Sequence, residues 1–172
     1  TSAGLSATAS ESGSSIVGSA QSDTLIGGAG NDSLTGGGGN DLITVGAGAD
    51  SVSAGDGNDR INFAVDDLTS NDTVSGGNHT TGDTLVLTSF GTLVDADLTN
   101  VSTIEALQLA DGTNAITLGS ESESAGIVSI YGGTGADTIT VAAYSTNGVT
   151  IDAGAGADVI TGGAGNDTFV ID

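Results

Sequence analysis

The chain has 172 residues, enough for one domain, and carries 22 acidic residues against one basic residue, Arg60, for a net charge of −21. Nucleic acid, anionic membranes and anionic polysaccharides are disfavoured as partners, because their phosphates and acid groups are recognised by Lys and Arg. Cysteine is absent, which excludes disulfides and thiolate sites, and no stretch approaches the roughly 20 apolar residues of a membrane-spanning helix, so we expect no membrane insertion.

Five nonapeptides follow one another in register from residue 18 to residue 62. They read GSAQSDTLI, GGAGNDSLT, GGGGNDLIT, VGAGADSVS and AGDGNDRIN, and the pattern returns at 132–140, 153–161 and 162–170. The eighth position is aliphatic in the five front units and is Ile139, Ile160 or Phe169 in the rear ones. The sixth position is always aspartate: Asp23, Asp32, Asp41, Asp50, Asp59, Asp137, Asp158 and Asp167.

Each unit divides into a loop and a short strand. Positions one to four are rich in glycine, which permits a tightly curled backbone that exposes its carbonyl groups next to one carboxylate. Such an oxygen-rich loop suits a hard cation, and calcium fits better than magnesium because it tolerates irregular coordination. Positions seven to nine favour a strand whose eighth residue points inward, and strands stacked about 4.8 Å apart would form a ladder of these residues.

The sequence resembles the RTX family of calcium-binding nonapeptide repeats, whose consensus is G-G-x-G-x-D-x-U-x, where U is a large aliphatic residue. Units 27–35, 36–44 and 162–170 match this consensus fully. The resemblance implies an all-β fold, a right-handed parallel β-roll or β-solenoid with two units per turn. It also implies calcium between loops 18 residues apart. The earlier loop would contribute its second and fourth carbonyls and its Asp; the later loop would contribute its first and third carbonyls and its Asp.

Carried onto this chain, the resemblance implies four calcium sites. The first comprises Gly28, Gly30, Asp32, Val45, Ala47 and Asp50. The second comprises Gly37, Gly39, Asp41, Ala54, Asp56 and Asp59. A weaker site, in which Ser and Gln replace glycine, comprises Ser19, Gln21, Asp23, Gly36, Gly38 and Asp41. A fourth site, with loops 21 residues apart, comprises Gly133, Gly135, Asp137, Ala153, Ala155 and Asp158.

The plainer alternative is that these aspartates only terminate turns, where Asp is common. Stacking would then bring like charges into direct opposition without a cation. Asp167 belongs to a half-built calcium loop. Asp72 and Asp83 lie 22 and 24 residues after Asp50 and Asp59, and we expect them to end the two calcium columns.

The middle segment, 63–131, keeps strand-like runs at 84–89, 103–109, 114–118 and 127–131 but loses the aspartate loops. The stretch 98–109 fits either a solenoid turn or one helical turn followed by a strand.

His79 is a metal ligand or, more simply, an exposed loop residue, and Glu105 is a buried ligand or a residue of the outer face. Glu121 and Glu123 are expected in a solvated Ser-rich loop. The segment resembles parts of bacterial surface-layer and adhesin proteins that carry RTX repeats.

We therefore expect one continuous domain in four parts. They are a flexible linker leading into a first strand (1–17), an N-terminal β-roll (18–62), the repeat-poor middle (63–131) and a C-terminal β-roll (132–172). Catalysis is not expected, because the single histidine and the absence of lysine leave few of the groups that catalysis needs.

The function expected first is a calcium-dependent structural module of a secreted bacterial surface protein that self-associates or contacts neighbouring domains. The alternative is a calcium-triggered folding and secretion module of an RTX toxin or enzyme. A carbohydrate-binding module is disfavoured by two Tyr and no Trp. The chain stops two residues after its last repeat and has no signal-peptide pattern, so we expect a fragment of a longer protein exported by type I secretion to the cell surface or the medium.

Overall fold

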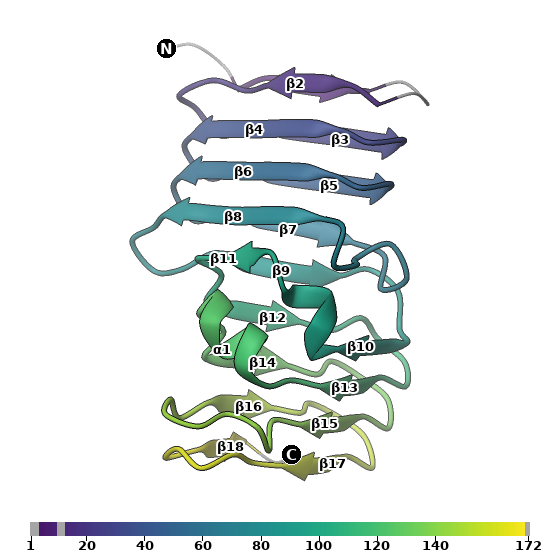
Figure 1. Cartoon of the computed structure of the whole chain (residues 1–172), viewed down its shortest axis with the longest axis vertical. Coiled ribbons are helices and arrows are strands. Elements are labelled where there is room, and N and C mark those ends of the chain that lie inside the picture. The colour runs from purple at the N-terminus through teal and green to yellow at the C-terminus, as the bar shows by residue number, and fades with distance from the viewer. Residues whose placement is uncertain (1–3, 10–12, 171–172) are drawn as a thin grey trace.

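Strands form where the repeat places its short β-branched and Thr-rich segments, and they stack into a parallel β-solenoid (Figure 1). The computed structural model describes residues 4–9 and 13–170. In Figure 1 the chain descends with β4, β6 and β8 running leftward in front and β3 and β5 running rightward behind, which is right-handed winding.

Three parallel sheets line the solenoid. Sheet A receives one strand from every turn, in the order β1 (Ser6–Thr8), β3 (Thr24–Ala29), β5 (Leu42–Ala47), β7 (Arg60–Phe63), β9 (Thr84–Leu87), β12 (Ala106–Gln108), β14 (Ser129–Tyr131), β16 (Thr150–Asp152) and β18 (Thr168–Val170). Sheet B consists of β2 (Ser15–Val17), β4 (Ser33–Gly38), β6 (Ser51–Asp56), β8 (Thr73–Asn78) and β11 (Val101–Ser102). Sheet C consists of β10 (Thr92–Val94), β13 (Ala115–Thr117), β15 (Thr138–Thr140) and β17 (Val159–Thr161).

The eighth-position residues form the expected inward ladder. Ile61 pairs in register with Ile43 on one side and with Leu85 on the other, and all three side chains are buried. The ladder of sheet A continues through Leu107, Ile130 and Ile151 into the repeat-poor half, so a single apolar core runs along the axis. Phe169, on the last strand, is 43% exposed, because no further described strand covers it.

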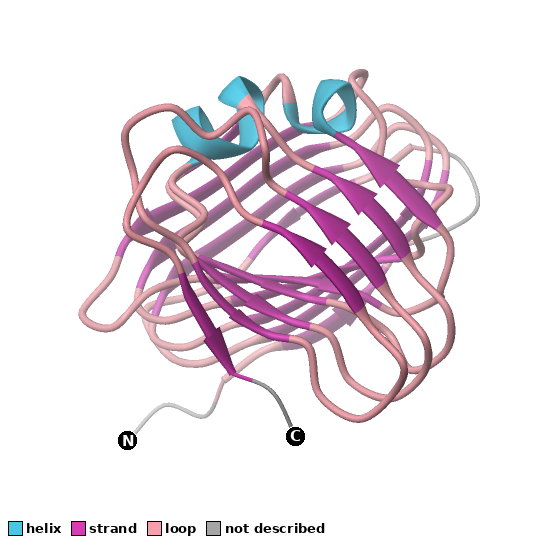
Figure 2. Ribbon diagram, turned by 90° about the horizontal axis from the view of Figure 1, so that it is seen from below, coloured by secondary structure: helices cyan, strands magenta, loops and turns pink. Residues whose placement is uncertain are grey.

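Two helical turns close one side of the solenoid where sheet B gives way to sheet C (Figure 2). They are a 3-10 helix at Asp95–Leu98 and α1 (Ser120–Ala125). The Asp95 carboxylate accepts the backbone N–H groups of Gly119, Glu121 and Ser122, which fastens α1 to the preceding turn and lowers the pKa of Asp95 despite its burial. These contacts position the turns that carry the second half of the core.

The structure corrects two expectations outside the repeats and decides between the two alternatives for a third segment. Residues 1–17 contain more strand than a linker leading into one strand, because β1 and β2 pair with β3 and β4; residues 1–3 and 10–12 lie outside the described chain. The Ser-rich segment is α1, and its Glu123 is not simply solvated, since it accepts N–H groups from Ser145 to Asn147. The stretch 98–109 resolves as the end of a 3-10 turn followed by two short strands.

Candidate calcium sites

Aspartates of successive turns stack in two columns along the front half of the solenoid. The sheet-A column, whose members directly precede sheet A strands, is Asp23, Asp41, Asp59 and Asp83. The sheet-B column is Asp32, Asp50 and Asp72. In each column one carboxylate oxygen, Oδ1, accepts the backbone N–H of the aspartate one turn earlier at 2.7–2.8 Å. Each aspartate therefore helps to fix the spacing of the turns.

The other carboxylate oxygen, Oδ2, is what suggests a metal. In six aspartates this oxygen is buried and has no hydrogen-bond partner: Asp32, Asp41, Asp50, Asp59, Asp83 and Asp137. Leaving such an acceptor unpaired costs about 1–3 kcal/mol, and more when it is charged. The one guanidinium of the chain does not relieve them, because Arg60 donates to Gln108 Oε1 at 3.1 Å. The free oxygens therefore offer positions for a cation from outside the chain.

The pKa values of these carboxyl groups reflect the same shortage of positive charge. Burial raises the pKa of Asp41 to about 6, with the neighbouring charges of Asp59 and Asp23 acting in the same direction. Burial likewise raises the pKa of Asp50, Asp59 and Asp83. In a metal-free chain the charged form is therefore disfavoured at these positions, and a bound divalent cation would reverse the effect.

The loops bring backbone carbonyl groups close to these free oxygens. In loop 36–41, Gly37 and Gly39 have φ of 112° and 96°, values that residues other than glycine rarely adopt. A Cβ added to Gly36 would collide with both Asp41 Oδ2 and the Ala54 carbonyl of the next turn. One added to Gly27 would meet Asp32 Oδ2 at 2.9 Å and collide with the Val45 carbonyl. Carboxylate and carbonyl oxygens of consecutive turns thus converge, which is the donor set that calcium takes.

For three of the four sites implied by the sequence, the structure brings the two loops together in this way. In the first site, loops 27–32 and 45–50 also meet where Gly30 N–H donates to the Ala47 carbonyl at 2.9 Å, and Gly28 pairs with Gly46. In the second, Gly37 pairs with Gly55, and Gly38 with Asp56. In the fourth, Asp137 N–H donates to Asp158 Oδ1 at 2.9 Å.

The rear loops of that fourth site also bring their carbonyl groups together. A Cβ added to Gly132 would collide with the Ala153 carbonyl, close to the free oxygen of Asp137. Gly133 and Gly135 have positive φ, and the Gly135 N–H donates to the Ala155 carbonyl at 2.8 Å. The 21-residue spacing therefore still stacks these loops.

In the weaker site, Asp23 has no free oxygen, although Asp41, which this site shares with the second, keeps its Oδ2 free. Asp23 Oδ2 accepts the backbone N–H of Ser19, and Oδ1 accepts that of Leu5. Neither Ser19 nor Gln21 adopts the positive φ of the glycines that they replace. Asp167 is closed in the same manner, since its Oδ2 accepts the N–H of Gly163 at 2.8 Å.

Asp72 and Asp83 take up the column positions expected of them. Asp50 N–H donates to Asp72 Oδ1, and Asp59 N–H to Asp83 Oδ1, both at 2.8 Å, although the chain between them is four and six residues longer than the 18-residue period. Asp72 Oδ2 accepts the N–H of Thr69 at 2.8 Å, so that end of the sheet-B column is closed by the protein itself. Asp83 Oδ2 remains free.

Two further column members do not belong to glycine loops of the nine-residue repeat. Glu105 Oε2 accepts the N–H of Asp83 at 2.7 Å, which extends the sheet-A column by one turn. Asn114 N–H donates to Asp137 Oδ1 at 2.8 Å and begins the rear column. Both residues stand two positions before an inward aliphatic residue, in Glu105-Ala106-Leu107 and Asn114-Ala115-Ile116. A search for Asp, Glu or Asn at that spacing would have found them.

A comparison with protein families agrees with this geometry. The family model of the RTX calcium-binding nonapeptide repeat matches in four copies, at residues 12–43, 35–67, 124–143 and 147–170, which is more than half of the chain. The chain belongs to the RTX calcium-binding repeat family. No curated protein and no solved structure matches it. Its RTX repeats indicate a structural module that binds calcium.

RTX repeats are typical of secreted proteins. In the described part of the chain, none of the helices has the length and apolar character needed to cross a membrane.

Proposed function

We propose that this RTX chain is a calcium-dependent structural module of a secreted bacterial surface protein, of the surface-layer or adhesin type. The six buried carboxylate oxygens without partners carry the calcium part of the proposal. Each free oxygen would define one slot between two turns that holds one Ca²⁺. The slots of Asp32, Asp41 and Asp137 are the three sites described above, and those of Asp50 and Asp59 would add one further slot to each column. The slot of Asp83 has a different donor set. Five such ions would carry ten positive charges, about half of the net charge of −21.

Calcium would then control folding. The metal-free chain repels itself, and each glycine in its loops loses more backbone freedom on folding than any other residue. Each Ca²⁺ links two turns, and neighbouring slots share strands, so that filling one slot orders the next and binding is cooperative. The chain would remain extended where calcium is scarce and fold where calcium is plentiful, outside the cell.

Native mass spectrometry counts the ions directly. We expect about five Ca²⁺ per chain in a millimolar-range calcium buffer, with few partly loaded species because binding is cooperative. A chain that carries no calcium under these conditions would exclude the proposal. A broad, statistical distribution of loaded species would exclude the cooperative mechanism alone.

The surface role is supported by the middle segment. Residues 63–131 build turns of the same solenoid and share its core, so repeat-rich and repeat-poor parts form one long rod. Strands β17 and β18 form the lower end of the rod in Figure 1, and their Val159, Phe169 and Val170 are exposed. Such an end suits end-to-end association or contact with a neighbouring domain. Light scattering in calcium should show self-association that increases with concentration. A chain that stays monomeric at high concentration would remove self-assembly from the proposal.

The alternative, a folding and secretion module of an RTX toxin or enzyme, requires the same calcium chemistry. It differs in what adjoins the module. Sequencing of the flanking coding region separates the two, since a catalytic or pore-forming domain next to this chain would favour the alternative.

A further inference from the structure

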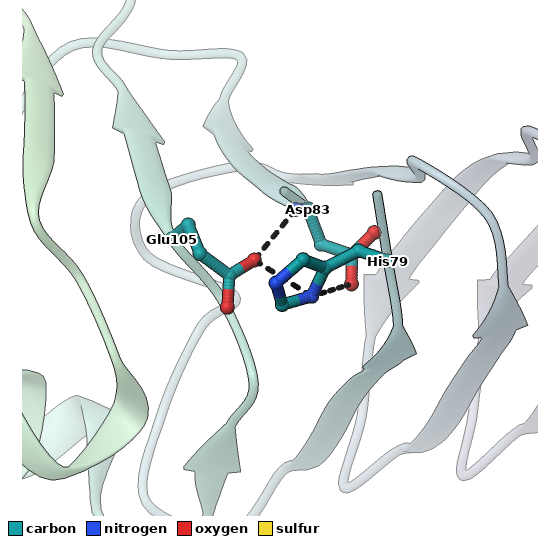
Figure 3. Close-up of side chains that lie close together, drawn as sticks. All are labelled: His79, Asp83 and Glu105. Carbon is teal, nitrogen blue, oxygen red and sulfur yellow. Dashed lines mark hydrogen bonds and ion pairs between the residues drawn. The ribbon is translucent and has the colours of Figure 1, made fainter. Parts of the chain in front are cut away.

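The sheet-A column ends in a cluster that is unlike the repeat loops. His79 lies in the loop after β8, Asp83 directly precedes β9, and Glu105 directly precedes β12 (Figure 3). His79 Nδ1 is 3.3 Å from Glu105 Oε2 and 3.7 Å from Asp83 Oδ2, and the three ligand atoms lie within 4.8 Å of one another. The Asp83 side chain is fully buried, and its Oδ2 faces the imidazole with no hydrogen-bond partner.

This slot is built like the calcium slots as far as the backbone is concerned. A Cβ on Gly76 would collide with both Asp83 Oδ2 and the Thr103 carbonyl, as one on Gly36 would with Asp41 Oδ2 and the Ala54 carbonyl. Thr103 has φ of 52°, a positive value that no other non-glycine residue of the described chain adopts. Backbone strain of this kind persists only where surrounding contacts enforce it, here with the carbonyl of Thr103 beside the free carboxylate oxygen.

The side chains make the difference. Where a repeat slot offers oxygen atoms alone, this slot contains an imidazole nitrogen and a glutamate. Calcium takes oxygen ligands, whereas imidazole nitrogen with carboxylates suits zinc and other first-row transition metals. Two ligands at about 2.0–2.1 Å from a tetrahedral Zn²⁺ lie about 3.4 Å apart, which is close to the separations of His79 Nδ1 from its two carboxylates. Both separations that involve His79 therefore fit a tetrahedral metal.

The loop that presents His79 is held in place before any metal binds. It runs from Gly76 to Asp83, two residues longer than a repeat loop. The Oδ1 of Asn58, in the loop one turn earlier, accepts the N–H of Thr81 at 2.8 Å and that of Thr80 at 3.1 Å. The insertion is thus fastened to the neighbouring loop, while the His79 side chain stays 32% exposed and accessible to an ion from solution.

We propose that His79, Asp83 and Glu105 form a site for one Zn²⁺ or a similar divalent transition metal at the end of the sheet-A column. The three side chains supply one ligand each, and the fourth position is open to water or to a ligand from outside the chain. This site is distinct from the calcium slots in its donor set, and it remains available when those slots are full.

The test uses calcium-saturated protein whose folding has been checked by circular dichroism. Calorimetric titration with ZnCl₂ in excess calcium should show one zinc per chain. His79→Gln should weaken zinc binding more than about tenfold, the scale of disturbing even an outer-shell partner, while leaving the calcium-induced fold intact. Thr81→Ala, an exposed change in the same loop, is the matched control and should bind zinc normally.

A second readout relies on the chain having a single histidine. Long-range proton–nitrogen correlation spectra contain one imidazole, and zinc should shift its Nδ1 resonance far more than Nε2. The proposal would be overturned if the folded, calcium-loaded protein bound no zinc. It would also be overturned if the His79→Gln variant bound zinc as tightly as the unmodified chain. Zinc that displaces calcium stoichiometrically without moving the Nδ1 resonance would also overturn it, since zinc would then occupy a calcium slot. None of these results bears on whether calcium folds the chain, which is measured separately.

Discussion

The backbone N–H of Asp41 donates to Oδ1 of Asp59 at 2.7 Å, 18 residues further along the chain, while the other oxygen of each carboxylate is buried without a partner. One oxygen of each aspartate thus belongs to the protein and the other is free for a metal. The two groups have like charges on adjacent turns, which is unfavourable in a folded chain unless a cation lies between the turns.

Removing one of these carboxylates should cost one calcium ion and the stability that comes with it. Asp41→Asn keeps the shape of the side chain and removes its charge, so we expect a loss of about 2.7 kcal/mol when calcium is 100-fold above its dissociation constant. Denaturant unfolding in calcium measures this loss. Asp66→Asn, which removes the same charge from an exposed position, is the control. Equal effects of the two variants would mean that net charge, rather than a site, governs stability.

Loop conformation should matter even where no ligand atom is changed. Gly37→Ala places a Cβ on a residue with φ of 112° and against the Ser19 carbonyl, so we expect about 1–2 kcal/mol or more of destabilisation. Gly38→Ala in the same loop meets nothing closer than 3.5 Å and lacks the positive φ, so its effect should be much smaller. Thermal unfolding of the two variants compares them directly, and similar melting temperatures would argue against the observed loop backbone.

The inward ladder gives a prediction about packing. Ile61 is fully buried between Ile43 and Leu85, so Ile61→Ala should lose about 2–5 kcal/mol of folding free energy. Leu42→Ala, on the neighbouring strand of the same sheet, truncates a side chain that is 39% exposed and should cost far less. Urea unfolding in calcium measures both losses of stability. Equal stability of the two variants would contradict the parallel register.

Acid should have opposite effects with and without calcium. The pKa of Asp41 is about 6 in the folded metal-free chain against an ordinary value of 3.8, so the folded state holds the proton more tightly. Its contribution to metal-free stability is therefore fully present below about pH 4 and is lost as the pH rises through 6. Asp50, Asp59 and Asp83 act in the same direction.

Circular dichroism in calcium-free buffer should accordingly show more β structure at pH 5 than at pH 7. In excess calcium the trend should reverse, because protons compete with the metal for the same oxygens. A metal-free chain that loses β structure steadily on acidification would contradict the assignment of buried, uncompensated carboxylates.

Sequence alone predicted the columns wherever the nine-residue period was strict, since the 18-residue spacing of Asp32 and Asp50 fixes the register of the turns. It was less informative where a role needs no particular side chain. Leu5 and Ser14 extend the columns by one turn at the N-terminus, but they do so through backbone N–H groups that donate to Asp23 and Asp32. Any residue except proline can supply that donor, so 1–17 had no repeat signal, and the sequence predicted only one of its two strands.

The cluster at His79 could not be predicted, because the path of the longer loop 76–83 does not follow from the repeat. Glu105 meets Asp83 across 22 residues that include a strand of sheet C and a 3-10 turn, and no period relates the two. The sequence could show that His79 and Glu105 were unusual among aspartate loops. Only the fold brings both side chains to the one carboxylate oxygen left free at the end of the column.

The most direct test of the central claim is a calcium titration of chelator-treated protein at neutral pH, followed by far-ultraviolet circular dichroism. The buried, unpaired oxygens of Asp41 and its neighbours predict a largely unfolded spectrum without calcium and a steep, cooperative appearance of the β signal as calcium is added. A β spectrum already complete without calcium would show that the metal does not fold this chain.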